Sequence, residues 1–97
     1  MLLSEFISFK RNELKLSQAE LADRLLISTA YINDIEHGRR FPSSDNFIVK
    51  LSQVFNVSTD YFYYLTGRIP PDIREMNLTP NNVSFLYSQF RQKEINN

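Results

Sequence analysis

The polar side chains that follow residue 28 carry groups able to hydrogen-bond to the edges of DNA bases. An Asn amide can pair with adenine through two hydrogen bonds, and an Asp carboxylate can accept from the N4 amino group of cytosine. An Ala or Thr methyl group can contact the methyl group of thymine. All four residue types occur within six positions, as Thr29, Ala30, Asn33 and Asp34.

Groups suited to phosphate lie on both sides of this stretch. Arg39 and Arg40 follow it and supply positive charge. Gln18 precedes it, at the expected start of a helix, where free backbone N–H groups favour an anion. As an isolated pair the two arginines would be interpreted as solvated surface, but beside these residues we favour phosphate contact.

Few residues in this sequence could catalyse a reaction or bind a metal ion. The chain has one histidine, His37, and no cysteine. It also lacks a glycine-rich phosphate loop and a recognisable pair of catalytic carboxylates. We therefore expect no enzyme activity, no cofactor and no metal, and interpret His37 as a residue at a helix C-terminus, where its charge would suit the dipole.

Composition favours one small globular domain. The chain has 97 residues, of which 42% are hydrophobic and 23% charged, with a formal net charge of zero. Neutrality counts against nucleic-acid binding, although only the binding face needs to be positive. Without cysteines, a signal-peptide pattern or an apolar run of about 20 residues, we expect a cytoplasmic protein with no membrane partner.

A start signal for helices recurs along the chain. In each case an apolar residue precedes a Ser or Thr cap, and a second apolar residue follows at the fourth helical position, as in a hydrophobic staple. The four sets are Leu16-Ser17-Leu21, Ile27-Ser28-Ile32, Val57-Ser58-Phe62 and Leu78-Thr79-Val83. Pro42-Ser43 with Phe47 is a looser version, and Glu20 completes a capping box with Ser17.

These signals predict an all-α fold. The expected helices span 3–13, 18–25, 29–37, 44–55, 59–66 and 80–93, with a short helix from about residue 70 to Met76. Short helices cannot each bury an apolar face alone, so the first five should form one compact bundle. The expected core comprises Leu3, Phe6, Ile7, the Lys10 stem, Leu14, Leu16, Leu21, Ala22, Leu25, Ile32, Ile35, Phe47, Ile48, Leu51, Val54, Phe55, Phe62 and Leu65.

The second and third predicted helices are spaced as a helix-turn-helix unit. Their caps, Ser17 and Ser28, are eleven residues apart, which leaves two helices of about two turns and a short connection. In such a unit the second helix enters the major groove of DNA.

Three segments resemble the Cro/phage-repressor, or xenobiotic-response-element-type, helix-turn-helix family of transcriptional regulators. They are Ser17-Gln18-x-x-Leu21-Ala22, Ile35-Glu36-x-Gly38-Arg39-Arg40-x-Pro42-Ser43 and Asn56-Val57-Ser58-x-Asp60-Tyr61-Phe62, within a similarity over about residues 3–67. The resemblance implies a five-helix repressor-like domain and a structural salt bridge between Arg11 and Glu36. We expect base contacts from Thr29, Ala30, Tyr31, Asn33 and Asp34, and phosphate contacts from Gln18, Ser28, His37, Arg39 and Arg40.

Two residues depart from the family pattern. Leu26 occupies the turn position that usually holds Gly; a positive φ there would cost about 1–2 kcal/mol, unless the turn is adjusted. Asp34 places a negative charge where phosphates crowd. It either reads cytosine or lowers the non-specific affinity for DNA.

The chain divides into a domain over 1–67 and a C-terminal extension over 68–97. An amphipathic helix in the extension carries Val83, Leu86, Tyr87 and Phe90 on one face. This face could pack against its own domain, but we favour a dimer contact. The four aromatic residues at 61–64 could form a base-stacking platform for single strands, although the staple favours core and surface positions.

The leading interpretation is a sequence-specific regulator, most simply a repressor, that binds double-stranded DNA as a homodimer on a palindromic operator. The alternative is an antitoxin-like or other protein-binding module with weak DNA binding, whose partner would be a toxin or another regulator. Phage repressors, restriction-modification controllers and antitoxins share these residue patterns.

Overall fold

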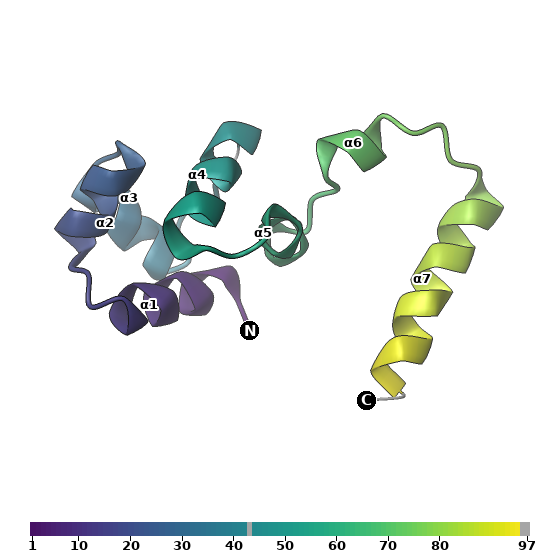
Figure 1. Ribbon diagram of the computed structural model, residues 1–97, viewed down its shortest axis with the longest axis horizontal. Helices are drawn as coiled ribbons and strands as arrows, with labels where there is room; N and C mark the ends of the chain where they lie inside the picture. Colours follow the sequence, from purple (N-terminus) through teal and green to yellow (C-terminus); the bar gives the residue numbers. More distant parts are fainter. Residues whose placement is uncertain (43, 96–97) are drawn as a thin grey trace.

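The computed structural model describes residues 1–42 and 44–95. Within these ranges the backbone is helical with no strands, as the sequence predicts (Figure 1). The helices are α1 (Leu3–Glu13), α2 (Gln18–Leu25), α3 (Thr29–Glu36), α4 (Asp45–Phe55), α5 (Thr59–Thr66), α6 (Pro71–Arg74) and α7 (Pro80–Ile95).

The capping residues explain where the helices begin. The hydroxyl oxygens of Ser17, Ser28 and Ser58 each accept a hydrogen bond from the backbone N–H three residues on, at 3.0, 3.1 and 3.3 Å. Thr79 accepts from the backbone of Asn82 at 3.2 Å. These contacts confirm the predicted starts of α2, α3, α5 and α7, because each satisfies a helical N–H that would otherwise lack a partner.

Other boundaries differ slightly from the prediction. The N-cap of α4 is Ser44, which accepts from the N–H of Phe47 at 3.1 Å; the cap proposed at Ser43 lies outside the described residues. Helix α3 ends at Glu36 and leaves His37 as its C-cap. Helix α6 has only four residues and stops before Met76.

One hydrophobic core joins α1 to α5. Leu21, Leu25, Ile32 and Ile48 are fully buried, as predicted. The whole set comprises Leu3, Ile7, Leu16, Leu21, Ala22, Leu25, Ile32, Ile35, Phe47, Ile48, Leu51, Phe55, Phe62 and Tyr63. Burying this apolar surface is the main force that holds the five helices together.

Two side chains occupy environments that the sequence pattern did not predict. Leu14 is 43% exposed, because Lys15 adopts a left-handed conformation (φ 58°) that turns the chain, so that Leu16 points into the core instead. Tyr63 is buried although Phe62 and Leu65 were the expected inward residues of α5. Its hydroxyl donates to Asp45 at 2.8 Å, which gives the buried polar atom a partner.

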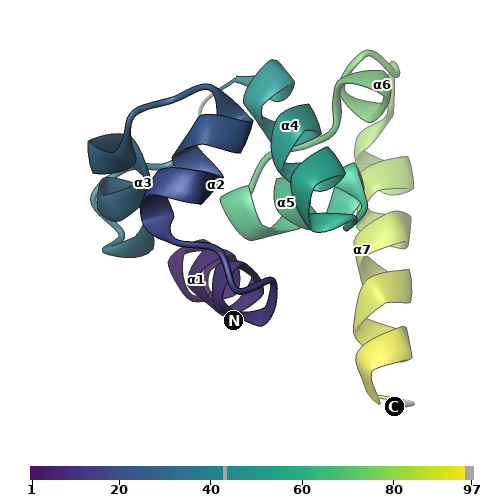
Figure 2. The ribbon, with the colours of Figure 1, turned by 60° about the vertical axis from the view of Figure 1, so that its left-hand side comes forward.

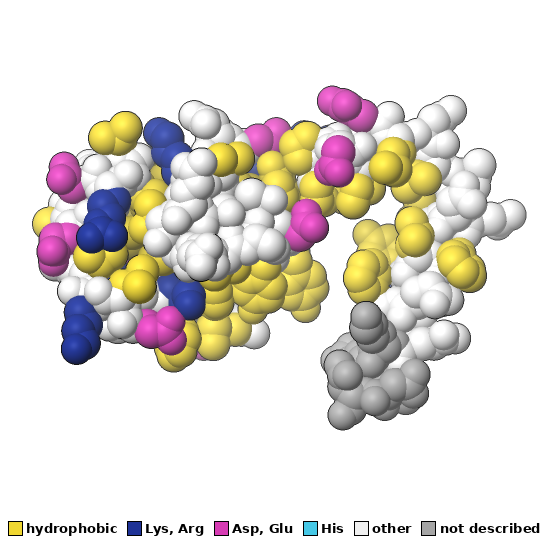
Figure 3. Space-filling view, viewed as in Figure 1, with side chains coloured by type: hydrophobic (Ala, Val, Ile, Leu, Met, Phe, Trp, Pro, Cys, Tyr) yellow, Lys and Arg dark blue, Asp and Glu magenta, His cyan; other side chains and the backbone are white. Residues whose placement is uncertain are grey.

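Figures 1 and 2 show α1–α5 gathered into a bundle, with α2 and α3 adjacent on one side and α5 on the other. The extension leaves the bundle after α5, and α7 stands apart from it. In the space-filling view, apolar side chains lie along α7 and on the side of the bundle that faces it, with open space between them (Figure 3).

The start of the extension is attached to the bundle through Asp45. Its Oδ1 accepts from the Tyr63 hydroxyl and from Arg68 Nη2, both at 2.8 Å, and from Arg74 Nη2 at 3.4 Å. The Tyr63 hydrogen bond, aided by the positive charges of Arg74 and Arg68, lowers the pKa of Asp45 below its usual value. One carboxylate at the beginning of α4 thus joins α4, α5 and the first part of the extension.

Across residues 1–42 and 44–95, no helix is both long and apolar enough to cross a membrane.

Candidate nucleic-acid interface

Helices α2 and α3 are joined by a short turn centred on Leu26. Leu26 has φ 59° and ψ 44°, so the position that usually holds Gly does require the left-handed conformation. The N–H of Ile27 donates to the carbonyl of Ala22 at 3.0 Å, and that of Leu26 to Asp23 at 3.2 Å. The turn therefore keeps its left-handed form and bears the strain that a Cβ atom causes there.

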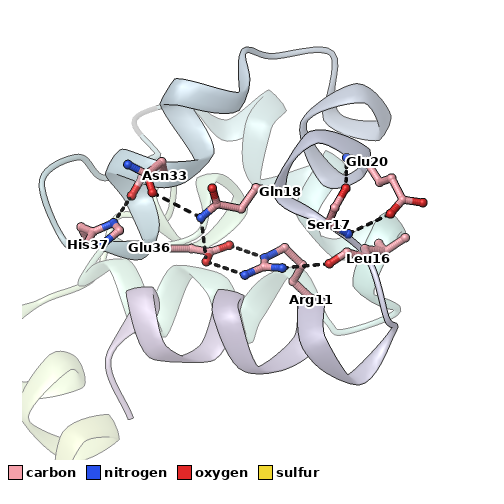
Figure 4. Close-up of polar contacts among 8 residues, drawn as sticks. All are labelled: Arg11, Leu16, Ser17, Gln18, Glu20, Asn33, Glu36 and His37. Atoms are coloured by element: carbon pink, nitrogen blue, oxygen red, sulfur yellow. Dashed lines mark hydrogen bonds and ion pairs between the residues drawn. The ribbon is translucent and has the colours of Figure 1, made fainter.

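A polar network fixes α3 against α1 and α2 (Figure 4). Arg11 Nε and Nη2 donate to the two carboxylate oxygens of Glu36 at 2.6 and 3.0 Å, and its Nη1 donates to the Leu16 carbonyl at 2.8 Å. The ion pair that the resemblance implies is therefore present, with side chains only 14% and 6% exposed. The hydrogen bond to Glu36 raises the pKa of Arg11 above its usual value.

Gln18 extends this network to the middle of α3. Its Nε2 donates to Glu36 Oε1 at 3.2 Å and to Asn33 Oδ1 at 3.4 Å. The phosphate contact expected of Gln18 remains a prediction. Its side-chain nitrogen forms hydrogen bonds within the protein. The bond to Asn33 orients the amide of that residue, which the sequence alone did not indicate.

The predicted base-contacting residues divide into two groups along α3. Thr29 and Ala30, in the first turn, are exposed, as is the cap Ser28. Tyr31, Asn33 and Asp34 are half-buried. The Tyr31 ring meets Phe47 edge to face, with centroids 5.7 Å apart. Within α3 the exposed side chains are therefore those of Thr29 and Ala30, at its start.

The C-terminal end of α3 folds back on itself. Gly38 has φ +72°, a conformation that glycine adopts without strain. The N–H of Arg39 then donates to the Asp34 carbonyl at 2.8 Å. The His37 Nδ1 lies 2.8 Å from the Asn33 carbonyl, and because a carbonyl only accepts, Nδ1 carries the proton in this contact.

Asp34 pairs with the two arginines that follow α3. Its Oδ1 lies 3.2 Å from Arg39 Nη1, and its Oδ2 lies 3.8 Å from Arg40 Nε. Both arginine side chains remain about 60% exposed, at 60% and 61%. The residue pattern did not predict this cluster, although the turn signal at Gly38 indicates that residues 34 and 39 can meet.

The predicted dimer residues lie on α7, outside this surface. Val83, Leu86, Tyr87 and Phe90 are 36%, 45%, 50% and 71% exposed. None of the four side chains is buried against the bundle. The dimer contact remains a prediction.

No group of three or more His, Cys, Asp or Glu residues that could hold a metal ion occurs among the described side chains. The surface formed by α2, α3 and Arg39–Arg40 offers hydrogen-bonding side chains and positive charge.

Comparison with known proteins gives matches to this part of the chain. A family model described as helix-turn-helix matches residues 7–62, from within α1 to within α5. The HTH-type transcriptional regulator RamB of Mycobacterium tuberculosis, strains CDC 1551 / Oshkosh and H37Rv, is 38% identical over 69 residues. This alignment covers 70% of the chain but only 14% of RamB.

A solved structure is similar as well. The crystal structure of SinR, a master regulator for biofilm formation, in complex with DNA has a TM-score of 0.57 and 28% identity to this chain. The alignment covers 63% of this chain and 97% of the SinR chain. The bundle thus has the architecture of a protein solved with DNA bound.

Proposed function

The chain belongs to the helix-turn-helix family, in its Cro/C1 type, and from this premise we propose that it is a transcriptional regulator that recognises a specific sequence in double-stranded DNA. Helix α3 would lie in the major groove, whose width admits an α-helix. Binding over a promoter would exclude the transcription machinery, so the protein would act as a repressor.

The observation that carries this proposal is the position of the first turn of α3. Thr29 and Ala30 are exposed there, and Arg39 and Arg40 supply positive charge at the other end of the same helix. A protruding helix with cations beside it matches the shape and charge of a groove between two phosphate backbones.

The polar network beneath α3 gives the proposed interface its rigidity. Arg11 and Glu36 join α1 to α3, and Gln18 links α2 to Asn33. Base recognition depends on side chains held in place before DNA arrives, because flexible contacts lose entropy on binding. We assign Arg11, Glu36 and the Gln18 amide to positioning α3, and Asn33 to base contact.

We further propose that two copies associate through α7 and bind a palindromic operator. Val83, Leu86, Tyr87 and Phe90 lie at spacings that place them on one helical face, and all are accessible. A two-fold dimer would present its two α3 helices to half-sites about 34 Å apart. The same face could instead bind a different protein, which is the second candidate function.

Selection of bound duplexes from a random pool tests sequence recognition, and sedimentation of the complex gives its stoichiometry. A palindrome bound by two chains would support the proposal in full. A protein that binds no duplex at low salt would contradict it. A monomer that selects a single half-site would contradict the dimer alone and favour a different partner for α7.

The role of the arginines has its own test. Replacing Arg39 and Arg40 together by Ala should weaken binding to every duplex and flatten the salt dependence of log K by about two units if both contact phosphate. Arg74→Ala is the control, since it removes positive charge from α6, away from α3 (Figure 1). An unchanged slope in the double variant would refute the phosphate contacts.

A further test concerns Asn33. Asn33→Ala should relax the preference at one base position of the selected sequence, because a bidentate contact distinguishes one base from the others. A uniform loss at all positions would show that Asn33 only supports α3.

A further inference from the structure

Asp34 contacts both cations of the proposed interface. One carboxylate oxygen faces Arg39 Nη1 at 3.2 Å, and the other faces Arg40 Nε at 3.8 Å. Each oxygen is thus directed at a different guanidinium. A DNA phosphate that bound these arginines would seek the same donors, because carboxylate and phosphate oxygens are interchangeable acceptors for guanidinium groups.

The backbone and two aromatic rings hold the three side chains together. The turn at Gly38 brings the Arg39 N–H within 2.8 Å of the Asp34 carbonyl, so residues 34 and 39 stay adjacent whatever their side chains do. The Arg40 guanidinium lies over the Tyr31 ring, 5.5 Å from its centroid. Tyr31 in turn packs against Phe47 in the core.

The charge of this cluster is lower than its two arginines suggest. Asp34 cancels one of the two positive charges next to α3. We propose that Asp34 competes with DNA phosphate for Arg39 and Arg40, and so lowers the affinity of the protein for any duplex. This inference rests on the proposed function, since it concerns the same surface.

The competition is weak enough to be overcome. The arginines are about 60% exposed and Asp34 is 33% exposed, and ion pairs at exposed positions are only modestly stable. A phosphate can therefore displace the carboxylate, at a cost that reduces binding without preventing it. Contacts to bases would then contribute a larger share of the total affinity.

The test measures the dissociation constant for a duplex of random sequence at fixed salt. Asp34→Asn should bind about 3- to 10-fold more tightly than the unchanged protein, the gain expected when two exposed ion pairs no longer compete. Asp34→Glu keeps the charge and should stay near the unchanged protein. Asp60→Asn, on α5 away from α3, removes the same charge elsewhere and should leave binding unaltered (Figure 1).

Competition is separated from simple repulsion by repeating Asp34→Asn in a chain that also carries Arg39→Ala and Arg40→Ala. The gain should disappear there, because no guanidinium remains for the carboxylate to hold. A gain that persists in this background would overturn the proposal, since it would show that Asp34 repels phosphate directly.

Other outcomes also decide the question. No gain from Asp34→Asn in a protein that binds DNA would overturn the inference and leave the proposed function intact. A loss confined to one base position would identify Asp34 as a cytosine reader instead. If the unchanged protein binds no duplex, both the function and the inference fail. Thermal unfolding of each variant confirms that it remains folded.

Discussion

The bundle and the extension use apolar residues in opposite ways. In α1–α5 most of the large apolar side chains converge on one core, and Phe62, Leu51 and Ile32 are fully buried. Beyond Tyr63, no side chain that the structure describes is buried. The bundle therefore completes its own core, whereas the apolar face of α7 stays exposed.

The two regions also differ in how they are attached. Ion pairs and hydrogen bonds within the bundle join helices that already share a core. The extension contacts the bundle through a partly buried pair of Asp45 with Arg68 and an exposed pair of Asp45 with Arg74. Pairs that remain accessible to solvent add little stability, so we expect the stability of the bundle to be nearly independent of α7.

Truncating one aromatic residue in each region tests this difference most strongly. Phe62→Ala should lower the free energy of unfolding by about 3–5 kcal/mol, because it leaves a cavity in the core. Phe90→Ala, at a side chain that is 71% exposed, should leave the unfolding of dilute protein unchanged. Urea denaturation followed by circular dichroism measures both.

Phe90→Ala should act on association instead. Sedimentation at rising concentration should show a weaker dimer for this variant than for the unchanged chain. Equal losses of stability in the two variants at low concentration would show that α7 belongs to the core, contrary to the comparison.

The ion pair between α1 and α3 should have the next largest effect. Arg11→Ala leaves the Glu36 carboxylate, only 6% exposed, without its charged partner and should cost about 2–4 kcal/mol. Arg74→Ala is the matched control, since its pair with Asp45 is exposed, and it should cost less than about 1 kcal/mol. A double-mutant cycle with Glu36→Gln would show a coupling near zero if the contact contributes nothing.

The turn between α2 and α3 should give a smaller change of opposite sign. Leu26 is 79% exposed and has φ 59°, so Leu26→Gly removes strain and loses little packing. Allowing for the greater freedom of Gly in the unfolded chain, we expect a gain of about 0.5–1 kcal/mol. Leu14→Gly, at φ −82°, is the control and should destabilise the protein. A loss at Leu26 would indicate that its side chain has a contact beyond this chain.

The smallest effect should be the loss of folding stability at low pH that arises from Asp45, at the junction between the bundle and the extension. Hydrogen bonding to Tyr63 lowers the pKa of Asp45 in the folded state, so the unfolded state takes up the proton first as pH falls. The resulting stability is present above about pH 4 and is lost below it. Glu20, whose pKa the Ser17 contacts lower, contributes with the same sign.

Melting temperatures between about pH 2.5 and 6 measure this effect. Asp45→Asn should show a shallower decline on the acid side than the unchanged protein, whereas Asp60→Asn should not. Identical acid profiles for all three proteins would show that the Asp45 cluster does not hold the extension in place.

Much of the fold follows from local patterns. Ser17, Ser28 and Ser58 mark helix starts because a cap bonds to an N–H only three residues away, and such a bond does not depend on the rest of the chain. The spacing of apolar residues then indicates which face is buried. The same locality explains why the α2–α3 unit, and the family similarity that goes with it, could be recognised from the residues.

The arrangement of side chains at the proposed interface is harder to predict from local patterns. The sequence identified the residues after position 28, but which side chains lie free depends on neighbours far along the chain. Phe47 holds Tyr31, and Gln18 holds Asn33 across fifteen positions. Leu14 and Tyr63 were misjudged for the same reason, since a left-handed Lys15 and a carboxylate on α4 decide their environments.

The sequence by itself therefore determined where the helices begin, which residues form most of the core and which helix could meet DNA. Tertiary structure decided the partners: Arg11 with Glu36, Asp45 with Tyr63, and Asp34 with the two arginines beyond Gly38. The physical reason is the distance along the chain over which each interaction acts. Caps and periodicity act over one or two turns, whereas an ion pair between separate segments exists only after packing or a chain reversal has brought the charges together.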